Sequence, residues 1–419
     1  MFSTLSSEGV RAERFSQLWN NDRLRKGLAV SLLLAAAGWL LADPLDHTPQ
    51  LLLTPQRWKR LKRDRVRQTT RWQNFEARVQ AGADSPERGF ELALYYAATQ
   101  DEARGKEAIA WALAHPCDRR QVSLVLDWCG ALVRQEDRDK LKAAACPAKA
   151  DRDAKSFRDE AFSKLANGED IAPLVEESKK SLVPRLAEGA FQDAAELYAA
   201  CEFFSVARTA TQIDLREEDR QFFSQLPAEL LLSLKADELE HPDSALHLAA
   251  LAWIGLDPNL ASSQYLQGWA ISDRQTIREG PGVAYEMLWA DPYLPGVGYQ
   301  NLDPWVYDRH GRLFARASWE ADSCHIRITT HGIEEENCPP HWRDAPSTFG
   351  RLTLIPATQQ CFELPKLKPD QSALLWRLKP GQTLGYGTGK KQRLSARADT
   401  AGMWHPGSNI EGKVCPAEH

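Results

Sequence analysis

Four side chains of the kinds that bind zinc fall within 18 residues: Cys324, His331, Cys338 and His341, in the order C-x6-H-x6-C-x2-H. A zinc ion needs four such ligands converging tetrahedrally. This spacing matches no established ligand pattern, and Cys324 with Cys338 could equally form a disulfide that closes a 15-residue loop. Three alternatives therefore stay open here: a metal site, a disulfide, or side chains with unrelated roles. We expect no metal and no cofactor.

Other motifs with known chemistry are missing from the sequence, since no G-x-S-x-G, H-E-x-x-H or C-x-x-C occurs. The stretch from Gly385 to Lys391 superficially resembles a phosphate-binding loop. It lacks the four-residue gap before Gly-Lys, however, and lies among expected strands, so it predicts a hairpin turn. The three glutamates 334–336 predict a solvated loop. His247 lies on an apolar helix face and predicts a core histidine.

An uncharged apolar segment runs over residues 27–42, directly after three basic residues within 23–26. Its sixteen residues would span about 24 Å as a helix, against about 30 Å for a bilayer's hydrocarbon core. A basic flank followed by a short apolar run is typical of a secretory signal or an uncleaved signal anchor. We expect a single-pass transmembrane anchor over 27–43, with 1–26 cytoplasmic and the bulk of the chain periplasmic or extracytoplasmic. A cleaved signal and a buried core helix are the alternatives.

The composition is that of a globular protein. The 419 residues include 52 basic and 57 acidic side chains, a net charge of −5, so the chain lacks the basic excess of nucleic-acid-binding proteins. Its eight cysteines fit an exported protein without demanding disulfides. The 14 tryptophans fit a well-packed core; the alternative is a sugar-binding cleft, where a ring stacks on a pyranose.

Helical patterns dominate from about residue 54 to about residue 270. Short polar loops between successive helices favour antiparallel pairs, and many pairs without a fixed repeat favour an (α/α) toroid-like domain over 54–270. The basic run within 55–79 predicts a solvated helix face, with a binding patch as the alternative. The other expected helices cover residues 89–99, 103–115, 120–133, 137–145, 157–166, 190–204, 218–235 and 244–254.

Glycine and proline break the chain over 271–310, which predicts a connector. After it, short runs of alternating polarity predict a small antiparallel β-sandwich-like domain over 311–419. The whole chain is therefore expected to be an α+β multidomain protein. The expected strands cover residues 313–319, 324–330, 352–355, 361–364, 374–378, 383–386 and 393–396.

Two stretches carry a resemblance to a known family. Residues 124–128, Leu-Val-Leu-Asp-Trp, resemble the "L-x-Y-D-W" helix in the toroid of heparinase II/III-like and alginate-lyase-like polysaccharide lyases. Residues 285–293 and 311–319, ending in Phe-Ala-Arg-Ala-Ser-Trp, resemble the junction in these families where the toroid ends and the β-sandwich begins. An export signal, then a helical domain, then a β domain is also their order. The motifs cover about 25 residues.

The resemblance implies β-elimination on a uronate-containing polysaccharide. That reaction needs a polar group to neutralise the uronate carboxylate, a tyrosine as acid or base, and usually a histidine that accepts the C5 proton. Tyr299 and Asn301, in one loop where the two domains should meet, are the candidates for the first two roles. His310 and His325 are the candidates for the third. A loop rich in proline and glycine also uses such residues simply to shape turns.

The second domain looks shorter than that of the lyases, and no clear Asn-Tyr-His set is present. The alternative is therefore a catalytically inactive envelope protein that binds a glycan or a protein. The expected partners are a uronate-containing polysaccharide and, through the N-terminal segment, the membrane. Nucleic acid is not expected.

Overall fold

The computed structural model describes residues 50–414, except for several gaps. All the described residues belong to one compact unit, Pro49–His419. The predicted N-terminal anchor lies outside the described residues, and no described helix is long and apolar enough to cross a membrane. The gaps are residues 83, 145, 147–151, 190–193, 235–243, 273–276, 308–311, 321, 330–331, 341, 343–346, 357–361, 364–371, 377–384, 389–394 and 397–412.

Thirteen α-helices occur among the described residues. They are α3 (Pro55–Arg67), α4 (Thr70–Ala81), α5 (Arg88–Thr99), α6 (Glu102–Ala114), α7 (Arg119–Trp128), α8 (Gln135–Ala143), α9 (Ala154–Ala166), α10 (Ala172–Gly189), α11 (Ala194–Thr211), α12 (Arg220–Ser233), α14 (Ala245–Leu256), α15 (Ala261–Ala270) and α16 (Gly282–Trp289). Two short 3-10 helices, η2 (Leu215–Asp219) and η4 (Tyr299–Asn301), lie between them and after them. The prediction of a helix-rich first domain is confirmed.

The helix boundaries follow local capping chemistry. The single helix expected over 55–79 is wrong: the chain breaks at Gln68, which is left-handed with φ 50°, and the Thr69 side chain caps a new helix, α4. The connector expected over 271–310 contains helix α16. Pro281 has helical dihedral angles just before Gly282, so it starts this helix where the sequence suggested only a break.

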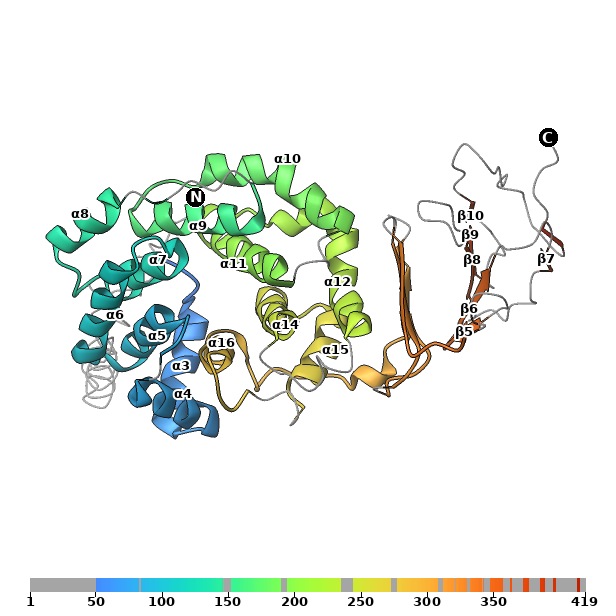
Figure 1. The fold of residues 1–419 in the computed structure, drawn as a ribbon, viewed down its shortest axis with the longest axis horizontal. Helices are drawn as coiled ribbons and strands as arrows, with labels where there is room; N and C mark the ends of the chain where they lie inside the picture. The colour runs from blue at the N-terminus through green and yellow to red at the C-terminus, as the bar shows by residue number, and fades with distance from the viewer. Residues whose placement is uncertain are drawn as a thin grey trace, which may run out of the picture. The chain divides into compact units, whose positions relative to one another are not determined.

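Six helices contact one another in a closed cycle: α5, α7, α9, α11, α14, α16 and back to α5 (Figure 1). The helices between them in the sequence pack around this cycle. For example, α6 contacts α5 and α7, α10 contacts α9 and α11, and α15 contacts α14. The buried apolar side chains from Leu51 to Trp289 form one continuous core, so α16 belongs to the helical domain and not to a linker.

The motif at 124–128 holds the start of the described chain in place. The Asp127 carboxylate accepts hydrogen bonds from the backbone N–H of Gln50 (3.0 Å) and of Leu51 (2.8 Å), and Trp128 Nε1 donates to the Leu51 carbonyl (2.8 Å). Leu51 itself is fully buried. Asp127 and Trp128 therefore have a structural role at this end of α7.

Two sheets follow the helices. The first is an antiparallel meander in the order β1-β2-β3-β4, formed by β1 (Trp305–Tyr307), β2 (Leu313–Arg316), β3 (His325–Thr329) and β4 (Gly332–Glu336). The loop predicted at 334–336 is wrong, because all three glutamates belong to β4, where Glu334 lies opposite Arg327. Cross-strand pairing of opposite charges stabilises such a strand.

The second sheet has the order β10-β9-β8-β6-β5. Its β6 and β8 pair in parallel, so the expectation of a purely antiparallel domain holds for the first sheet but not for this pair. Residues 385–388, the start of the stretch for which a hairpin turn was predicted, form strand β9. The strands are β5 (Ser347–Phe349), β6 (Leu352–Pro356), β8 (Ser372–Trp376), β9 (Gly385–Thr388) and β10 (Ser395–Ala396), and a separate pair joins β7 (Phe362–Glu363) to β11 (Lys413–Val414).

A disulfide decides between the alternatives left open for Cys324 and Cys338. Cys324 is bonded to Cys338, so these two residues are not metal ligands; His331 and His341 lie outside the described residues. A second disulfide joins Cys117 to Cys146 in the helical domain. Among the described residues no group of three or more histidine, cysteine or acidic side chains could hold a metal ion.

Candidate functional site

A pocket of about 780 Å³ opens at one end of the helical cycle; we call it the helix-end pocket. Its walls come from the N-terminal ends of six helices, namely α5, α7, α9, α11, α14 and α16. These helices therefore run in the same direction. The lining residues are Glu87, Cys117, Asp118, Arg119, Arg120, Gln121, Arg152, Lys155, Ser156, Arg158, Asp159, Glu160, Ala195, Tyr198, Ala245, Leu248 and Tyr285.

Charged groups dominate this lining. Five of the lining residues are cationic and four are carboxylates. Asp118 caps α7 by accepting a hydrogen bond from the Gln121 backbone N–H, and Asp153 caps α9 in the same way with Ser156. The caps satisfy some first-turn donors, but the aligned peptide dipoles still place partial positive charge at each helix start.

Arg120, in the first turn of α7, is the centre of the pocket floor. Its Nε and Nη2 donate to the Glu202 carboxylate at 2.9 and 2.8 Å, and its Nη1 donates to Glu87 Oε2 at 2.8 Å. Arg158 Nη1 approaches the other side of Glu202 at 3.3 Å. Arg120 is 6% exposed and Glu202 is fully buried, so this ion pair is shielded from water.

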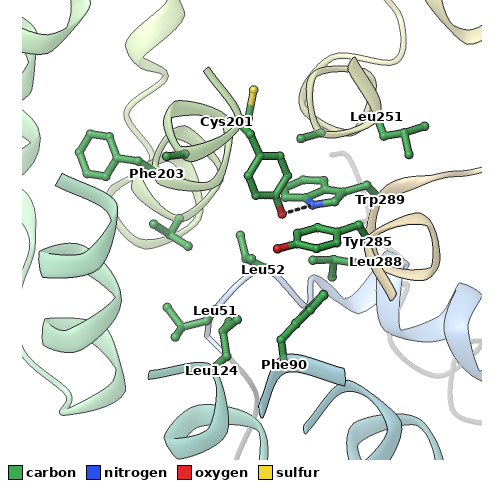
Figure 2. Packing of buried hydrophobic residues seen from close by; sticks show 14 of the residues in the cluster. Leu51, Leu52, Phe90, Leu124, Cys201, Phe203, Leu251, Tyr285, Leu288 and Trp289 are labelled. Carbon is green, nitrogen blue, oxygen red and sulfur yellow. Dashed lines mark hydrogen bonds between the residues drawn. The ribbon is translucent and has the colours of Figure 1, made fainter. Parts of the chain in front are cut away.

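Two tyrosines complete the floor. Tyr198 donates from its hydroxyl to Glu202 Oε1 at 2.8 Å and accepts a hydrogen bond from Trp289 Nε1 at 3.0 Å; Figure 2 shows the latter bond as a dashed line. Tyr285 lies beside Trp289 on α16, with the Phe90 ring 5.0 Å from its own and the Arg120 guanidinium carbon 5.2 Å from its ring centroid. We call Arg120, Glu202, Tyr198, Tyr285 and Glu87 the floor network.

Burial and charge set the protonation of this network. Burial alone would raise the pKa of Glu202, but Arg120 and Arg158 lower it below its ordinary value. Burial raises the pKa of Tyr198 well above its ordinary value, and the Glu202 charge adds to the rise. The pKa of Tyr285 is likewise raised well above its ordinary value by burial, which the neighbouring Arg120 opposes. Both tyrosines therefore stay protonated near neutral pH, and Tyr198 donates its proton in the hydrogen bond to Glu202.

Glu87 differs from Glu202 because it reaches the pocket. Its side chain is 22% exposed, against 0% for Glu202. Burial raises the pKa of Glu87, while Arg120 opposes that rise. A partly exposed carboxyl group with a raised pKa is a group that can take up and release a proton.

Three of the residues predicted to be catalytic are described, and all three lie outside the helix-end pocket. Tyr299 is in η4, half-buried, with its ring edge-on to Trp319 at 5.4 Å, and Asn301 at the end of η4 is exposed. His325, in β3, is buried opposite Arg316, and its Nε2 is 3.5 Å from a Glu336 oxygen. None of these three residues lines the helix-end pocket. The fourth, His310, lies outside the described residues.

Sequence reasoning missed the floor network. Tyr198 and Glu202 have the i, i+4 spacing of one helix face, and Asp118 followed by Arg119 and Arg120 has the form of a helix cap followed by a basic first turn. These signals point to a helix start, but nothing in them shows that six helix starts meet. His247 is buried as predicted, with its ring 5.0 Å from that of Trp269.

Comparison of the chain with models of known protein families and with curated proteins gives no match.

Proposed function

We propose that this protein binds an acidic polysaccharide, of the uronate-containing class, in the helix-end pocket, and that it does so outside the cytoplasm, attached by its N-terminal segment. The observation that carries the proposal is the meeting of six helix N-termini around one pocket with five cationic side chains. Helix N-termini favour anions because backbone N–H groups and the helix dipole point toward the ligand.

One cation at the edge of the pocket, Arg119, is placed to bind a sugar carboxylate. Arg119 is exposed at the first position of α7, while Arg120 and Arg158 are committed to Glu202 below it. The lining carboxylates Glu87, Asp159 and Glu160 supply acceptors for sugar hydroxyls. The volume of the pocket lies within the range of about 300–1,000 Å³ that is ordinary for small-ligand sites.

The architecture supports the same class. A closed cycle of six helices, with the intervening helices around it, supports the predicted (α/α) toroid-like domain. A β domain follows it, as in the polysaccharide lyases that the sequence resembles. In this chain the stretch at 285–293 contributes Tyr285 to the pocket itself.

β-Elimination is a second candidate function, favoured by one specific observation. Tyr285 and Glu87 both line the pocket, and both contact Arg120: Glu87 accepts a hydrogen bond from it, and the Tyr285 ring lies 5.2 Å from its guanidinium carbon. Elimination needs a group that takes the C5 proton and a group that protonates the leaving oxygen. Glu87 is suited to the first role and Tyr285 to the second. Tyr299, Asn301, His310 and His325 remain the prediction from the sequence for this chemistry.

Binding is tested by electrophoresis of a chain beginning at Pro49 through gels that contain alginate, chondroitin, hyaluronan, heparan sulfate or polygalacturonate, with neutral dextran as control. We expect retardation by at least one acidic polymer and none by dextran. The Arg119→Gln/Lys155→Gln variant should lose the retardation, whereas Lys142→Gln/Lys180→Gln, which removes two exposed lysines outside the pocket, should keep it. Equal mobility in all gels would refute the proposal.

Elimination is tested separately by following the ultraviolet absorbance of the unsaturated uronate product. A lyase of the second kind gives a signal that Tyr285→Phe abolishes while binding persists. A signal that survives Tyr285→Phe but disappears in Tyr299→Phe would move the chemistry to the predicted site at the start of the β domain. No signal on any polymer that binds would leave binding as the function.

A further inference from the structure

Helix α3 has two opposite faces that are both basic but are used differently. Arg57, Arg60, Leu61 and Asp64 are buried. Arg57 donates to the Leu52 and Gly255 carbonyls, and Arg60 donates to the Leu288 carbonyl, so these guanidinium groups are part of the core. These two are only two of the seven cationic residues of α3.

The opposite face of α3 consists of Lys59, Lys62, Arg63, Val66 and Arg67; we call it the basic face. These positions follow the i, i+3, i+4, i+7, i+8 spacing of one helix stripe. Lys59, Val66 and Arg67 are exposed, and no described acidic side chain forms an ion pair with Lys59 or Arg67. The one acidic residue of α3, Asp64, is buried against Arg71.

Exposed apolar groups accompany these cations. Val66 is 82% exposed and Tyr293 is 48% exposed, and they are two of the three large apolar side chains that are exposed among the described residues. Arg63 lies over the Tyr293 ring at 3.8 Å, and Lys62 lies over the Trp58 ring at 4.0 Å. Cations interleaved with an exposed aliphatic residue and flanked by aromatic rings characterise helices that lie at a membrane surface.

We propose that the basic face of α3 docks on a surface of anionic phospholipid headgroups. Lys59, Lys62, Arg63 and Arg67 would neutralise the headgroup charges, while Val66 and Tyr293 would enter the headgroup layer. The inference goes beyond glycan binding, because no residue of α3 lines the helix-end pocket.

The length of the chain before α3 favours a membrane over another polyanion. The predicted anchor ends near Ala42, and Gln50 is held by Asp127. Eight residues of fully extended chain reach at most about 28 Å. With the anchor inserted, a chain this short keeps the start of the helical domain close to the bilayer, and α3 begins at Pro55, five residues after Gln50.

The test uses a chain beginning at Pro49, which contains the whole compact unit described here and lacks the anchor. It is floated with vesicles of phosphatidylcholine alone or with about one-third phosphatidylglycerol, at 0.1 and 0.5 M salt. We expect binding to the anionic vesicles only, weakened strongly at high salt because the charges are exposed. At about 1 kcal/mol per cation, Lys59→Gln/Arg67→Gln should weaken binding by about 30-fold.

The matched control is Lys142→Gln/Lys180→Gln, which removes the same charge from exposed sites on α8 and α10 and should bind like the parent chain. Val66→Ser should weaken binding without changing its salt dependence. No binding to anionic vesicles at 0.1 M salt would overturn the proposal. It would also be overturned if both double variants lost the same affinity, or if soluble acidic polysaccharide, but not vesicles, bound the basic face. None of these outcomes depends on the helix-end pocket.

Discussion

The guanidinium of Arg120 and the carboxylate of Glu202 form a buried ion pair at the floor of the helix-end pocket, with Nε and Nη2 both donating to the carboxylate. Arg120 comes from the first turn of α7 and Glu202 from α11, 82 residues later. The pair thus connects two helices of the closed cycle and forms part of the pocket floor. Arg119, one residue earlier, remains exposed.

Arg120→Ala should destabilise the protein severely. It leaves Glu202 as a buried charge with only Arg158 beside it, and breaking a buried pair in this way costs about 3–5 kcal/mol. Arg119→Ala, its exposed neighbour, should change the free energy of unfolding by less than about 0.5 kcal/mol. Urea unfolding of both variants measures the difference. Similar stabilities for the two would show that the floor network does not hold the domain together.

Glu202 should make stability depend on pH in the acid range. Its pKa is lowered in the folded state relative to the ordinary value of 4.5, chiefly by Arg120 and Arg158 against the effect of burial. The unfolded chain therefore binds the proton more readily, so the stabilisation is fully present above about pH 4.5 and is lost as the pH falls through the folded-state pKa. Unfolding free energies at several pH values should show this fall.

The matched variant is Glu202→Gln, which has no such titration. It should be less stable at pH 7, yet its unfolding free energy should fall less steeply between pH 5 and pH 3. A slope equal to that of the parent chain would assign the acid sensitivity to other carboxylates.

Asp127→Ala should free the start of the described chain. The variant loses the acceptor for the N–H groups of Gln50 and Leu51, and an unpaired buried donor costs about 1–3 kcal/mol. We expect lower stability and faster proteolysis near Leu51. Asp84→Ala, at an exposed position, is the control. If Asp127→Ala resists protease as the parent chain does, the clamp is not what holds this segment.

The buried thiols of Cys129 and Cys201 should not react with alkylating reagents in the native protein. Burial raises the pKa of Cys129 and of Cys201 far above the ordinary value, and both side chains are inaccessible. An alkylating reagent should therefore label neither residue until the chain unfolds. Peptide mapping after labelling in denaturant, without reductant, should find both modified and should find Cys117, Cys146, Cys324 and Cys338 unmodified. Labelling of any of these four would contradict the disulfides.

Local patterns predicted much of the secondary structure. Expected helices at 89–99 and 103–115 match α5 and α6 within a residue or so, since both have a clear apolar stripe and Asp101 caps the second. Helix α16 was missed because its Gly-Pro-Gly start reads as a break. The strand at 332–336 was missed because Glu334, Glu335 and Glu336 have low strand propensity and are stabilised by the neighbouring strand, including Arg327.

The pocket could not be predicted, for a physical reason. Its residues are drawn from six helices spread over about 200 positions, from Glu87 to Tyr285, and each looks ordinary in its own segment. Arg120 reads as a surface residue near a helix cap until Glu202 and Glu87 are placed beside it. The catalytic residues predicted at 299–325 were chosen because they lie close together in the sequence. A site can equally be assembled from residues that are far apart in the sequence, as the helix-end pocket is.

The most direct test of the central claim is a calorimetric titration of the chain beginning at Pro49 with a uronate oligosaccharide that retards it in the gel. The same oligosaccharide, with its carboxyl groups chemically reduced to primary alcohols, is titrated in parallel. Acidic-glycan recognition in the helix-end pocket predicts that the reduced sugar binds at least tenfold more weakly, and that Arg119→Gln/Lys155→Gln removes the difference. Equal affinities for the two sugars, or a preference that survives in this variant, would contradict it.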